Sequence, residues 1–252
     1  WVKATPQYGN AISIVNTAKS RKDPLQQIEG IVEREAVKPL LLGRDVKRWR
    51  AEPSKSILFL YDAANPKHAI SESVVATRYP QALRYLENFE DELRARKEYH
   101  RWGCKGPFYE LYRIGPYTFA KYKVVWQHTG FRGRMNVAVV GGPNTPMVVP
   151  DQKVILLPFD DEMEAHYACA YLASSVVEKI LGKYLGIDAS AHILDYIKLA
   201  LFDRRDAAHH QLAMLSLEAH RRVETGQSVL NIEAQIDQLA HTVFGNKLGF
   251  AA

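Results

Sequence analysis

Cysteines and long apolar runs are scarce in this sequence. It has two cysteines, Cys104 and Cys169, which are too few for a disulfide framework and show no metal-ligand spacing. No stretch reaches the roughly 18 apolar residues that cross a bilayer, and no signal peptide is visible. These absences exclude a disulfide-stapled secreted domain and a membrane span. They predict a cytoplasmic protein without a membrane partner.

Patterns typical of metal-dependent enzymes are also sparse. Asp45-x-Lys47 and Asp151-x-Lys153 match the Asp-x-Lys of nuclease strands, but a three-residue match often arises by chance. A nuclease centre needs two or three carboxylates that converge on Mg²⁺. Four histidines stand on expected helices without a Cys or Glu at ligand spacing: His209, His210, His220 and His241. We therefore expect neither a metal site nor a catalytic residue in this chain.

Length and composition are those of an ordinary globular protein. The 252 residues are 47% hydrophobic and 24% charged, which allows one large domain, or a domain with an appendage, around a sizeable core. The net charge of +5 is a modest excess, so its meaning depends on where the cations lie. Because the chain begins at Trp1 without a methionine, we expect it to be a piece of a longer protein.

Hydrophobic periodicity predicts an α+β protein. Short apolar runs bounded by Gly or Pro indicate strands, at residues 56–61, 117–126, 136–140 and 154–158, with a strand or short helix at 28–32. Apolar residues at three- and four-residue steps indicate helices, at residues 79–96, 162–185, 207–223 and 232–243. We expect a twisted, mainly antiparallel β core packed by the first two helices over residues 1–202. A helical C-terminal extension follows over residues 203–252.

A cationic string follows an apolar anchor near residue 43. The apolar residues 40–42 end at Gly43, and four cations come next: Arg44, Lys47, Arg48 and Arg50. Glycine can adopt a positive φ, so we expect a sharp chain reversal at Gly43. Four cations just after a buried anchor can form a rigid positive surface that contacts phosphate. Two alternatives stay open, since Asp45 can pair with one of the arginines and Trp49 can belong to the core.

A second positive zone lies between residues 91 and 134. Ten Lys and Arg residues stand there against four acids, interleaved with aromatic residues. Cations neutralise phosphates, while amides, histidines and arginine forks read base edges in the major groove. The alternative interpretation is a solvated cationic face whose aromatics only pack a β core. Three of the aromatics, Phe119, Tyr122 and Trp126, fit that core interpretation better.

Five sequence blocks follow one another along the chain, at residues 33–50, 106–126, 148–175, 192–220 and 233–239. They contain Pro-Leu-Leu-Leu-Gly-Arg-Asp, Gly-Pro-Tyr-Thr-Phe and Glu-Ala-His-Tyr, among other runs. The blocks resemble the C-terminal target-recognition region of class I adenine-specific (N-6) DNA methyltransferases, the TaqI-like specificity domains of restriction–modification systems. The sequence departs from that pattern at Ala173 and Ser174, which replace a usual Asn, and at residues 199–203, which lack a usual Pro.

The resemblance implies sequence-specific binding of double-stranded DNA, with residues 1–202 as the target-recognition domain. In the family, an N-terminal catalytic domain binds S-adenosylmethionine and methylates a flipped adenine. That domain needs a glycine-rich turn and an Asn/Asp-Pro-Pro-aromatic loop, and neither stands in this sequence. We therefore expect the cofactor and the chemistry to belong to a preceding methyltransferase domain. Whether the parent protein also cleaves DNA, alone or with a restriction endonuclease, stays open.

The DNA-contacting residues are predicted from charge and from loop position. The candidate phosphate contacts are Arg44, Lys47, Arg48, Arg50, Lys121 and Lys123. The candidate base-reading residues follow the strand that ends near Trp126, and are Gln127, His128, Arg132, Arg134 and Asn136. Second candidates are Arg101, Trp102 and Lys105. For each of them, a solvent-exposed polar side chain without a ligand is the competing interpretation.

The last helix suggests a different class of function. Four apolar residues occupy the a and d positions of a short seam: Ile232, Ile236, Leu239 and Val243. That seam suits a protein–protein module that dimerises the chain or docks a methylase or nuclease subunit. DNA binding and docking are compatible with each other, so the sequence keeps both.

Overall fold

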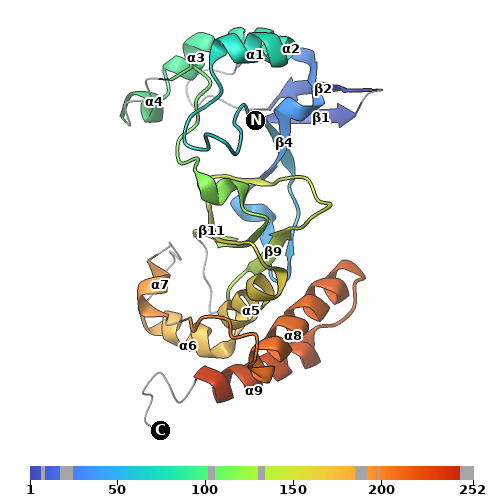
Figure 1. The fold of residues 1–252 in the computed structure, drawn as a ribbon, viewed down its shortest axis with the longest axis vertical. Helices are drawn as coiled ribbons and strands as arrows, with labels where there is room; N and C mark the ends of the chain where they lie inside the picture. Colours follow the sequence, from blue (N-terminus) through green and yellow to red (C-terminus); the bar gives the residue numbers. More distant parts are fainter. Residues whose placement is uncertain are drawn as a thin grey trace. The chain divides into compact units, whose positions relative to one another are not determined.

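The chain forms an α+β structure, as the sequence predicts (Figure 1). The computed structural model describes residues 1–6, 9–17, 25–101, 106–129, 134–184, 192–197 and 199–244. The strand pairs whose register is defined within these residues are antiparallel. No helix in this part of the chain has both the length and the apolar character required to cross a bilayer.

The regular elements are mostly short. The strands are β1 (Val2–Pro6), β2 (Ala11–Asn16), β3 (Glu29–Glu33), β4 (Val37–Leu41), β5 (Val46–Lys47), β6 (Arg50–Ala51), β7 (Lys55–Leu58), β8 (Tyr122–Gln127), β9 (Val137–Gly141), β10 (Val149–Pro150) and β11 (Val154–Phe159). The α-helices are α1 (Glu72–Arg78), α2 (Pro80–Glu87), α3 (Glu90–Arg94), α4 (Lys97–Arg101), α5 (Glu162–Ala173), α6 (Ser175–Tyr184), α7 (Ile193–Tyr196), α8 (Ala207–Glu224) and α9 (Leu230–Phe244). Three 3₁₀ turns are η1 (Arg34–Ala36), η2 (Gly43–Asp45) and η3 (Pro116–Phe119).

Contacts between residues divide the chain into two compact units. Unit 1 comprises Trp1–Leu40, Ser54–Phe119 and Pro146–Val149. Unit 2 comprises Leu41–Pro53, Ala120–Thr145 and Pro150–Ala252. This division differs from the boundary expected near residue 203. Helices α8 and α9 do not form a separate extension, because their apolar faces complete the same core as β8 and α5.

Unit 1 is built on a six-stranded sheet. The strand order is β10-β4-β7-β1-β2-β3, so β3 lies at one edge. Helix α2 packs beside β3, and the two are fixed by Glu33, whose carboxylate accepts hydrogen bonds from the backbone N–H groups of Gln81 and Ala82 at 2.9 and 3.0 Å. A carboxylate at a helix N-terminus satisfies donors that have no partner within the helix. The sheet edge and the start of α2 are therefore held together.

Unit 2 encloses a smaller sheet with the order β11-β8-β9. Residues 122–126 of the central strand β8 are all buried, since strands flank both its edges and α5 packs on the sheet. Helix α5 is buried without interruption from Ala165 to Ala173. Helices α5, α8 and α9 lie side by side in the lower part of Figure 1. This core is continuous, and it carries the hairpin described below.

The predicted elements are mostly present, with boundaries that differ. The strands at 136–140 and 154–158 are confirmed as β9 and β11, whereas the expected strand at 117–126 begins only at Tyr122, after the turn η3. The helix expected over 162–185 is two helices. It breaks at Ser174, whose backbone is extended with φ −74° and ψ 153°. Helix α6 then begins at Ser175, whose N–H donates to the Asp237 carboxylate of α9 at 2.7 Å.

The apolar seam of the last helix is used within unit 2. Ile232 and Ile236 are 4% and 1% exposed, and Leu239 and Val243 are partly buried against the same core. The seam was expected as an exposed docking or dimerisation surface. The structure removes the reason for that expectation, because α8, α5 and α6 already pack against α9.

Candidate nucleic-acid interface

The cationic string at residues 44–50 contains a small hairpin of unit 2. Strands β5 and β6 pair so that Arg48 and Trp49 form a two-residue turn between them. Trp49 has a φ of 64°, a left-handed backbone conformation that costs a non-glycine residue roughly 1–2 kcal/mol. Such strain persists only where the surrounding contacts hold the residue in place.

Trp49 is held by contacts on three sides. Its side chain is buried, with 1% exposed, and its indole Nε1–H donates to Glu233 Oε1 at 2.9 Å. Its backbone N–H donates to the carbonyl of Val137 in β9 at 2.9 Å. The ring of His220 in α8 meets the indole edge to face, with centroids 5.6 Å apart. The alternative in which Trp49 belongs to the core is therefore confirmed.

Arg48 also points into unit 2, which corrects its prediction as a phosphate contact. Its guanidinium forms ion pairs with Glu233 and, at 3.0 Å, with Glu178. It donates further hydrogen bonds to the carbonyls of Ala173 at 2.7 Å and Met135 at 3.2 Å. The side chain is only 15% exposed. With its donors used in this way, Arg48 anchors the hairpin to α5, α6 and α9 and is not available to a ligand.

The two carboxylates around Arg48 respond differently to their surroundings. Burial raises the pKa of Glu178, and the positive charges of Arg48 and Arg134 offset only part of this shift. Burial also acts upward on Glu233, but hydrogen bonds from Arg48 and Trp49 outweigh it and hold the pKa of Glu233 below its ordinary value. Glu233 is therefore the carboxylate that the hairpin keeps ionised.

The other cations of the string remain at the surface. The Arg44 side chain is 68% exposed and lies 3.9 Å from Asp45, which confirms the alternative in which Asp45 pairs with an arginine. Lys47 is exposed. Arg50 pairs with Glu52 at 2.6 Å, and both side chains are exposed. Exposed ion pairs of this kind are weak, so Arg44 and Arg50 can exchange their partners for a phosphate.

Gln127 and Asn136, predicted as base readers, are used to hold the hairpin segment. The Gln127 amide donates to the carbonyls of Gly43 at 2.7 Å and Val46 at 3.1 Å. Its Oε1 accepts a hydrogen bond from Asn136 Nδ2 at 3.2 Å. These bonds fix η2 and β5 against the end of β8. Gln127 is therefore a positioning residue in this structure, which corrects its prediction as a base reader. Asn136 uses one of its amide N–H groups in this way, and its predicted role in base readout stays a prediction.

Gly43 does not make the predicted positive-φ reversal. It opens the turn η2, and it is absent from the residues with a positive φ. A Cβ at this position would lie 3.0 Å from the carbonyl oxygen of Lys153. Glycine is therefore required here for close approach of two backbones, which brings Arg44 near the start of β11.

The two candidate lysines of the second block differ in their exposure. Lys123 is buried in β8 with 2% exposed, and its Nζ donates to the carbonyl of Ala120 at 2.9 Å. Burial lowers the pKa of Lys123 to about 8. Its prediction as a phosphate contact is therefore wrong, because the amine does not reach the surface. Lys121 is exposed, with Nζ 5.2 Å from the ring centroid of Tyr122.

The remaining candidates are divided between described and undescribed residues. His128 is half-buried, and its Nδ1 is buried without a hydrogen-bond partner among the described residues. Arg134 is 53% exposed and lies 3.6 Å from Glu178 and 3.3 Å from Glu233. Arg101 is exposed at the end of α4, in unit 1. Three candidates lie outside the described residues: Trp102, Lys105 and Arg132.

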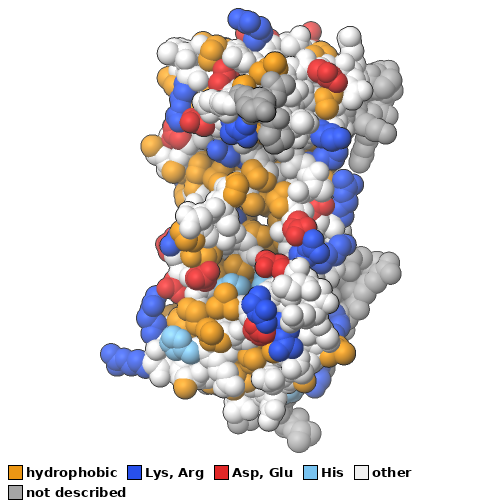
Figure 2. Space-filling view, turned by 90° about the vertical axis from the view of Figure 1, so that its right-hand side faces the viewer, with side chains coloured by type: hydrophobic (Ala, Val, Ile, Leu, Met, Phe, Trp, Pro, Cys, Tyr) orange, Lys and Arg blue, Asp and Glu red, His pale blue; other side chains and the backbone are white. Residues whose placement is uncertain are grey.

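The surface charge is mixed. On the face drawn in Figure 2, Lys and Arg side chains stand among Asp and Glu side chains and do not form one continuous positive area. Asp45 and Asp151, from the two Asp-x-Lys matches, accept hydrogen bonds from the backbone N–H groups of Leu42 at 3.0 Å and Lys153 at 2.8 Å. Across the described ranges, no three His, Cys, Asp or Glu side chains are grouped to hold a metal ion.

Sequence reasoning missed Glu178 and Glu233, the two carboxylates that receive Arg48. A signal was present for each of them. Glu178 interrupts the nearly all-apolar stretch 162–185, and Glu233 stands next to the buried Ile232 in the last helix. An acid on a buried helix face requires a charged or hydrogen-bonding partner. The sequence does not say which of the many cations that partner is.

The sequence matches no protein-family model, and no curated protein matches it either.

Proposed function

We propose that unit 2 is a sequence-specific recognition module for double-stranded DNA, which presents a target adenine to the catalytic domain of an adenine-N6 DNA methyltransferase. The five blocks that resemble the TaqI-like specificity domains are the basis of this assignment. In that family the catalytic domain carries S-adenosylmethionine and performs the transfer. This chain would supply affinity, orientation and sequence choice.

The hairpin at residues 46–51 is the observation that carries the proposal. Hydrogen bonds hold Arg48 and Trp49 in the core of unit 2. The neighbouring Lys47, in strand β5 of the same hairpin, is exposed. Arg44 and Lys121 are exposed elsewhere on unit 2. A cation on a rigid support loses less conformational entropy when it binds a phosphate than one on a mobile loop. The anchors therefore favour a defined phosphate contact at Lys47.

Phosphate contacts and base contacts have separate tasks. Arg44, Lys47, Arg50 and Lys121 would neutralise phosphates and set the register of the module on the duplex. Base choice would fall to the segment after β8, in which His128 and Arg134 are candidates among the described residues. Arg134 stays 53% exposed despite its contacts to Glu178 and Glu233, so its guanidinium retains donors for a guanine edge. Together these contacts help to offset the unstacking of an adenine, which costs a few kcal/mol.

Salt-dependent DNA binding tests the phosphate contacts. The 252-residue chain is titrated into a fluorescein-labelled mixed-sequence duplex at several salt concentrations, and anisotropy gives the dissociation constant. Each lost phosphate contact flattens the slope of log K against log salt by about 0.9. We expect Arg44→Ala/Lys47→Ala to weaken binding to all duplexes equally and to flatten the slope by about 1.8.

Lys67→Ala is the matched control, since Lys67 is an exposed lysine of unit 1. It should leave both the affinity and the slope unchanged. An unchanged slope for the Arg44/Lys47 double variant would remove the hairpin from the interface. Absence of measurable duplex binding by the wild-type chain at low salt would contradict the proposal as a whole.

Selection from a randomised duplex library tests sequence choice. The wild-type chain should enrich one site, and Arg134→Ala and Arg132→Ala should each relax the preference at one position, by about 1–3 kcal/mol. Lys47→Ala should enrich the same site as wild type with lower yield. If both arginine variants enrich an unaltered site, base readout belongs to other residues.

A further inference from the structure

Strand β3 forms one edge of the sheet in unit 1. Strand β3 is the last strand of its sheet and pairs only with β2 among the described strands. Ile31 lies in the middle of β3 and is 50% exposed, an unusual position for a large apolar side chain on a sheet edge. An unprotected edge presents backbone donors and acceptors to which another strand can pair.

The hydrogen-bond pattern shows which backbone groups face outward. The Asn16 N–H donates to the carbonyl of Ile28, and the Arg34 N–H donates to the carbonyl of Asn10. In an antiparallel pair, hydrogen-bonded and non-bonded residues alternate. With the register of β2 and β3, residues 28, 30, 32 and 34 therefore face β2. The N–H and C=O groups of Glu29, Ile31 and Glu33 point away from the sheet.

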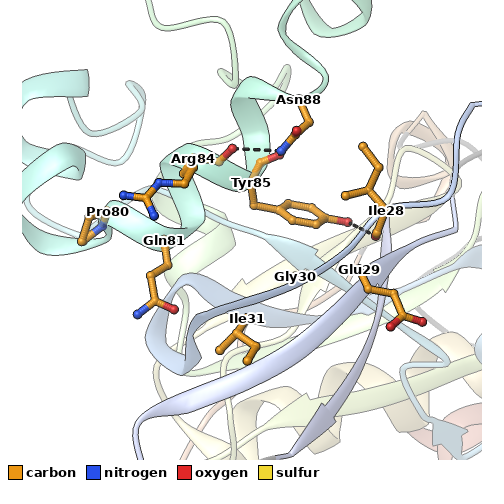
Figure 3. Close-up of a pocket in the computed structure, with 9 residues that line it drawn as sticks. All are labelled: Ile28, Glu29, Gly30, Ile31, Pro80, Gln81, Arg84, Tyr85 and Asn88. Carbon is orange, nitrogen blue, oxygen red and sulfur yellow. Dashed lines mark hydrogen bonds between the residues drawn. The ribbon is translucent and has the colours of Figure 1, made fainter.

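A groove of about 490 Å³ runs along this edge, between β3 and α2 (Figure 3). Its floor is residues 28–31, and its wall is the helix face that carries Gln81, Arg84 and Asn88. Tyr85 closes the inner side, because its hydroxyl donates to the carbonyl of Ile28 at 3.1 Å and its ring packs on Gly30. A strand edge beside a helix is the geometry that accepts an extended peptide by strand addition.

The charged residues that line the groove indicate which side chains an added strand would carry. Glu29 and Arg84 are both exposed, and neither forms an ion pair within the described part of the chain. Glu29 and Ile31 project from one face of β3, whereas Arg84 lies on the helix that covers the other face (Figure 3). Side chains of an added strand alternate between these faces. A basic residue would then meet Glu29, the next residue would be acidic and meet Arg84, and the third would be apolar and meet Ile31.

A second copy of this chain fits the same edge poorly. Antiparallel pairing of two β3 strands about Ile31 would place Glu29 of each copy opposite Glu33 of the other. Like charges directly opposite one another destabilise a strand pair. We infer that the edge of β3 and the α2 face form a docking groove for an extended segment of another protein that carries a basic–acidic–apolar triplet.

Two fluorescein-labelled peptides serve as probes: Thr-Thr-Lys-Glu-Val-Thr-Thr and its reverse, which together cover both strand directions. Anisotropy with the 252-residue chain should show saturable binding of one of them, with a dissociation constant of about 1 mM or tighter. Ile31→Pro removes the outward N–H without removing a bond of the β2–β3 ladder. It should weaken binding at least about tenfold, whereas Ile31→Val should bind within about twofold of wild type.

Arg84→Glu gives a second, independent readout that does not alter the strand. It should weaken binding of the bound peptide about tenfold, and a peptide with Lys in place of the central Glu should recover most of the loss. Urea denaturation confirms that each variant is folded. The inference is overturned if neither peptide binds, or if Ile31→Pro binds as wild type does. It is also overturned if sedimentation shows a dimer that Ile31→Pro abolishes, since the occupant would then be a second copy.

Discussion

The two units use polar groups in different ways. In unit 2, several polar side chains are satisfied internally: Arg48 is enclosed by Glu178 and Glu233, and His166 bonds to Ser216 in the core. In unit 1, the outward backbone groups of β3 have no strand partner among the described residues, and Glu29 and Arg84 beside them form no ion pair in that part of the chain. Buried polar networks specify one arrangement when every member is satisfied. We therefore expect the Arg48 network to hold the hairpin of unit 2 in one arrangement, whereas unit 1 carries the edge proposed above as a docking groove.

The same contrast is repeated within one hairpin. Lys47 and Arg48 are consecutive, yet Lys47 is exposed and Arg48 is 15% exposed with four partners. One residue fixes the hairpin, and the other remains available to a ligand. Substitutions that separate stability from binding therefore test the contrast directly.

The largest expected effect is that of Arg48→Met. Removing one partner of a buried ion pair costs about 3–5 kcal/mol, and here Glu178 and Glu233 would be left with the half-exposed Arg134 as their nearby cation. Urea denaturation should show this loss, with the strained Trp49 turn released at the same time. Arg50→Ala is the control in the same hairpin, and because its pair with Glu52 is exposed, its loss should leave the urea midpoint close to that of the wild type.

The triple variant Arg48→Met/Glu178→Gln/Glu233→Gln sharpens this test. Without charges to leave unpaired, it should recover part of the stability lost in Arg48→Met. If Arg48→Met alone unfolds at the wild-type urea concentration, the ion-pair network is not what holds the hairpin.

Unit 2 should also lose stability in mild acid. Burial lowers the pKa of His220 to about 4 and, with nearby His220, that of His166 to about 3. His220 donates from Nδ1 to the carbonyl of Ser216 at 2.7 Å, so its Nε2 accepts from the Val139 N–H at 2.9 Å. Protonation of Nε2 would break that second bond. Both rings are therefore neutral in the folded protein at neutral pH.

The direction in which stability changes with pH follows from proton linkage. The unfolded chain binds protons at these histidines below about pH 6.5, whereas the folded chain resists them until about pH 4. The stability they contribute is thus full above about pH 6.5 and falls as the pH falls, on the order of 1–2 kcal/mol for each histidine by about pH 5. Urea midpoints at the two pH values measure this, and His220→Gln should remove part of the dependence. The 86% exposed His192 is the control, and an equal effect of His192→Gln would contradict the assignment.

Local patterns predicted much of the fold. Strands β9 and β11 and helices α8 and α9 were predictable because apolar periodicity is a property of neighbouring residues. The burial of Arg48 could not be predicted in this way, because its partners Glu178 and Glu233 are 130 and 185 positions away in the sequence. A string of four cations looks uniform until those partners are placed. The charge pattern therefore predicted a positive surface but not which cation is buried.

The predictions of Lys123 as a phosphate contact and of a continuous helix through Ser174 were wrong for related reasons. Alternation along a strand reveals its buried face only when the other face is exposed, and residues 122–126 of β8 are buried throughout. Ser174 breaks a continuous apolar helix because Asp237, from the last helix, accepts the N–H of Ser175. Both features depend on packing between distant segments. The candidate site shares this dependence, which explains why it was less predictable than the fold.

A smaller effect is expected from Gly30→Ala in unit 1. A Cβ at Gly30 would lie 2.5 Å from Tyr85 Cδ2, so the helix that walls the groove must shift, at about 1–3 kcal/mol. Gly182→Ala in unit 2 is the matched control, because a Cβ at Gly182 would meet no heavy atom within 4 Å. That substitution in α6 should stabilise by about 0.5–1 kcal/mol. Equal urea midpoints for the two variants would show that Tyr85 does not pack against β3 in this way.

The smallest effect on stability is expected from Lys47→Ala. Lys47 is the neighbour of Arg48, whose substitution is expected to have the largest effect. Lys47 is exposed and its side chain takes part in no described ion pair, so its loss should change the free energy of unfolding by no more than about 0.5 kcal/mol. The same variant should lower duplex affinity and flatten the salt dependence by about 0.9. A binding loss without a stability loss is what a phosphate contact on a rigid support requires. A stability loss comparable to that of Arg48→Met would instead show that Lys47 belongs to the scaffold, and the distinction between the two neighbours would fail.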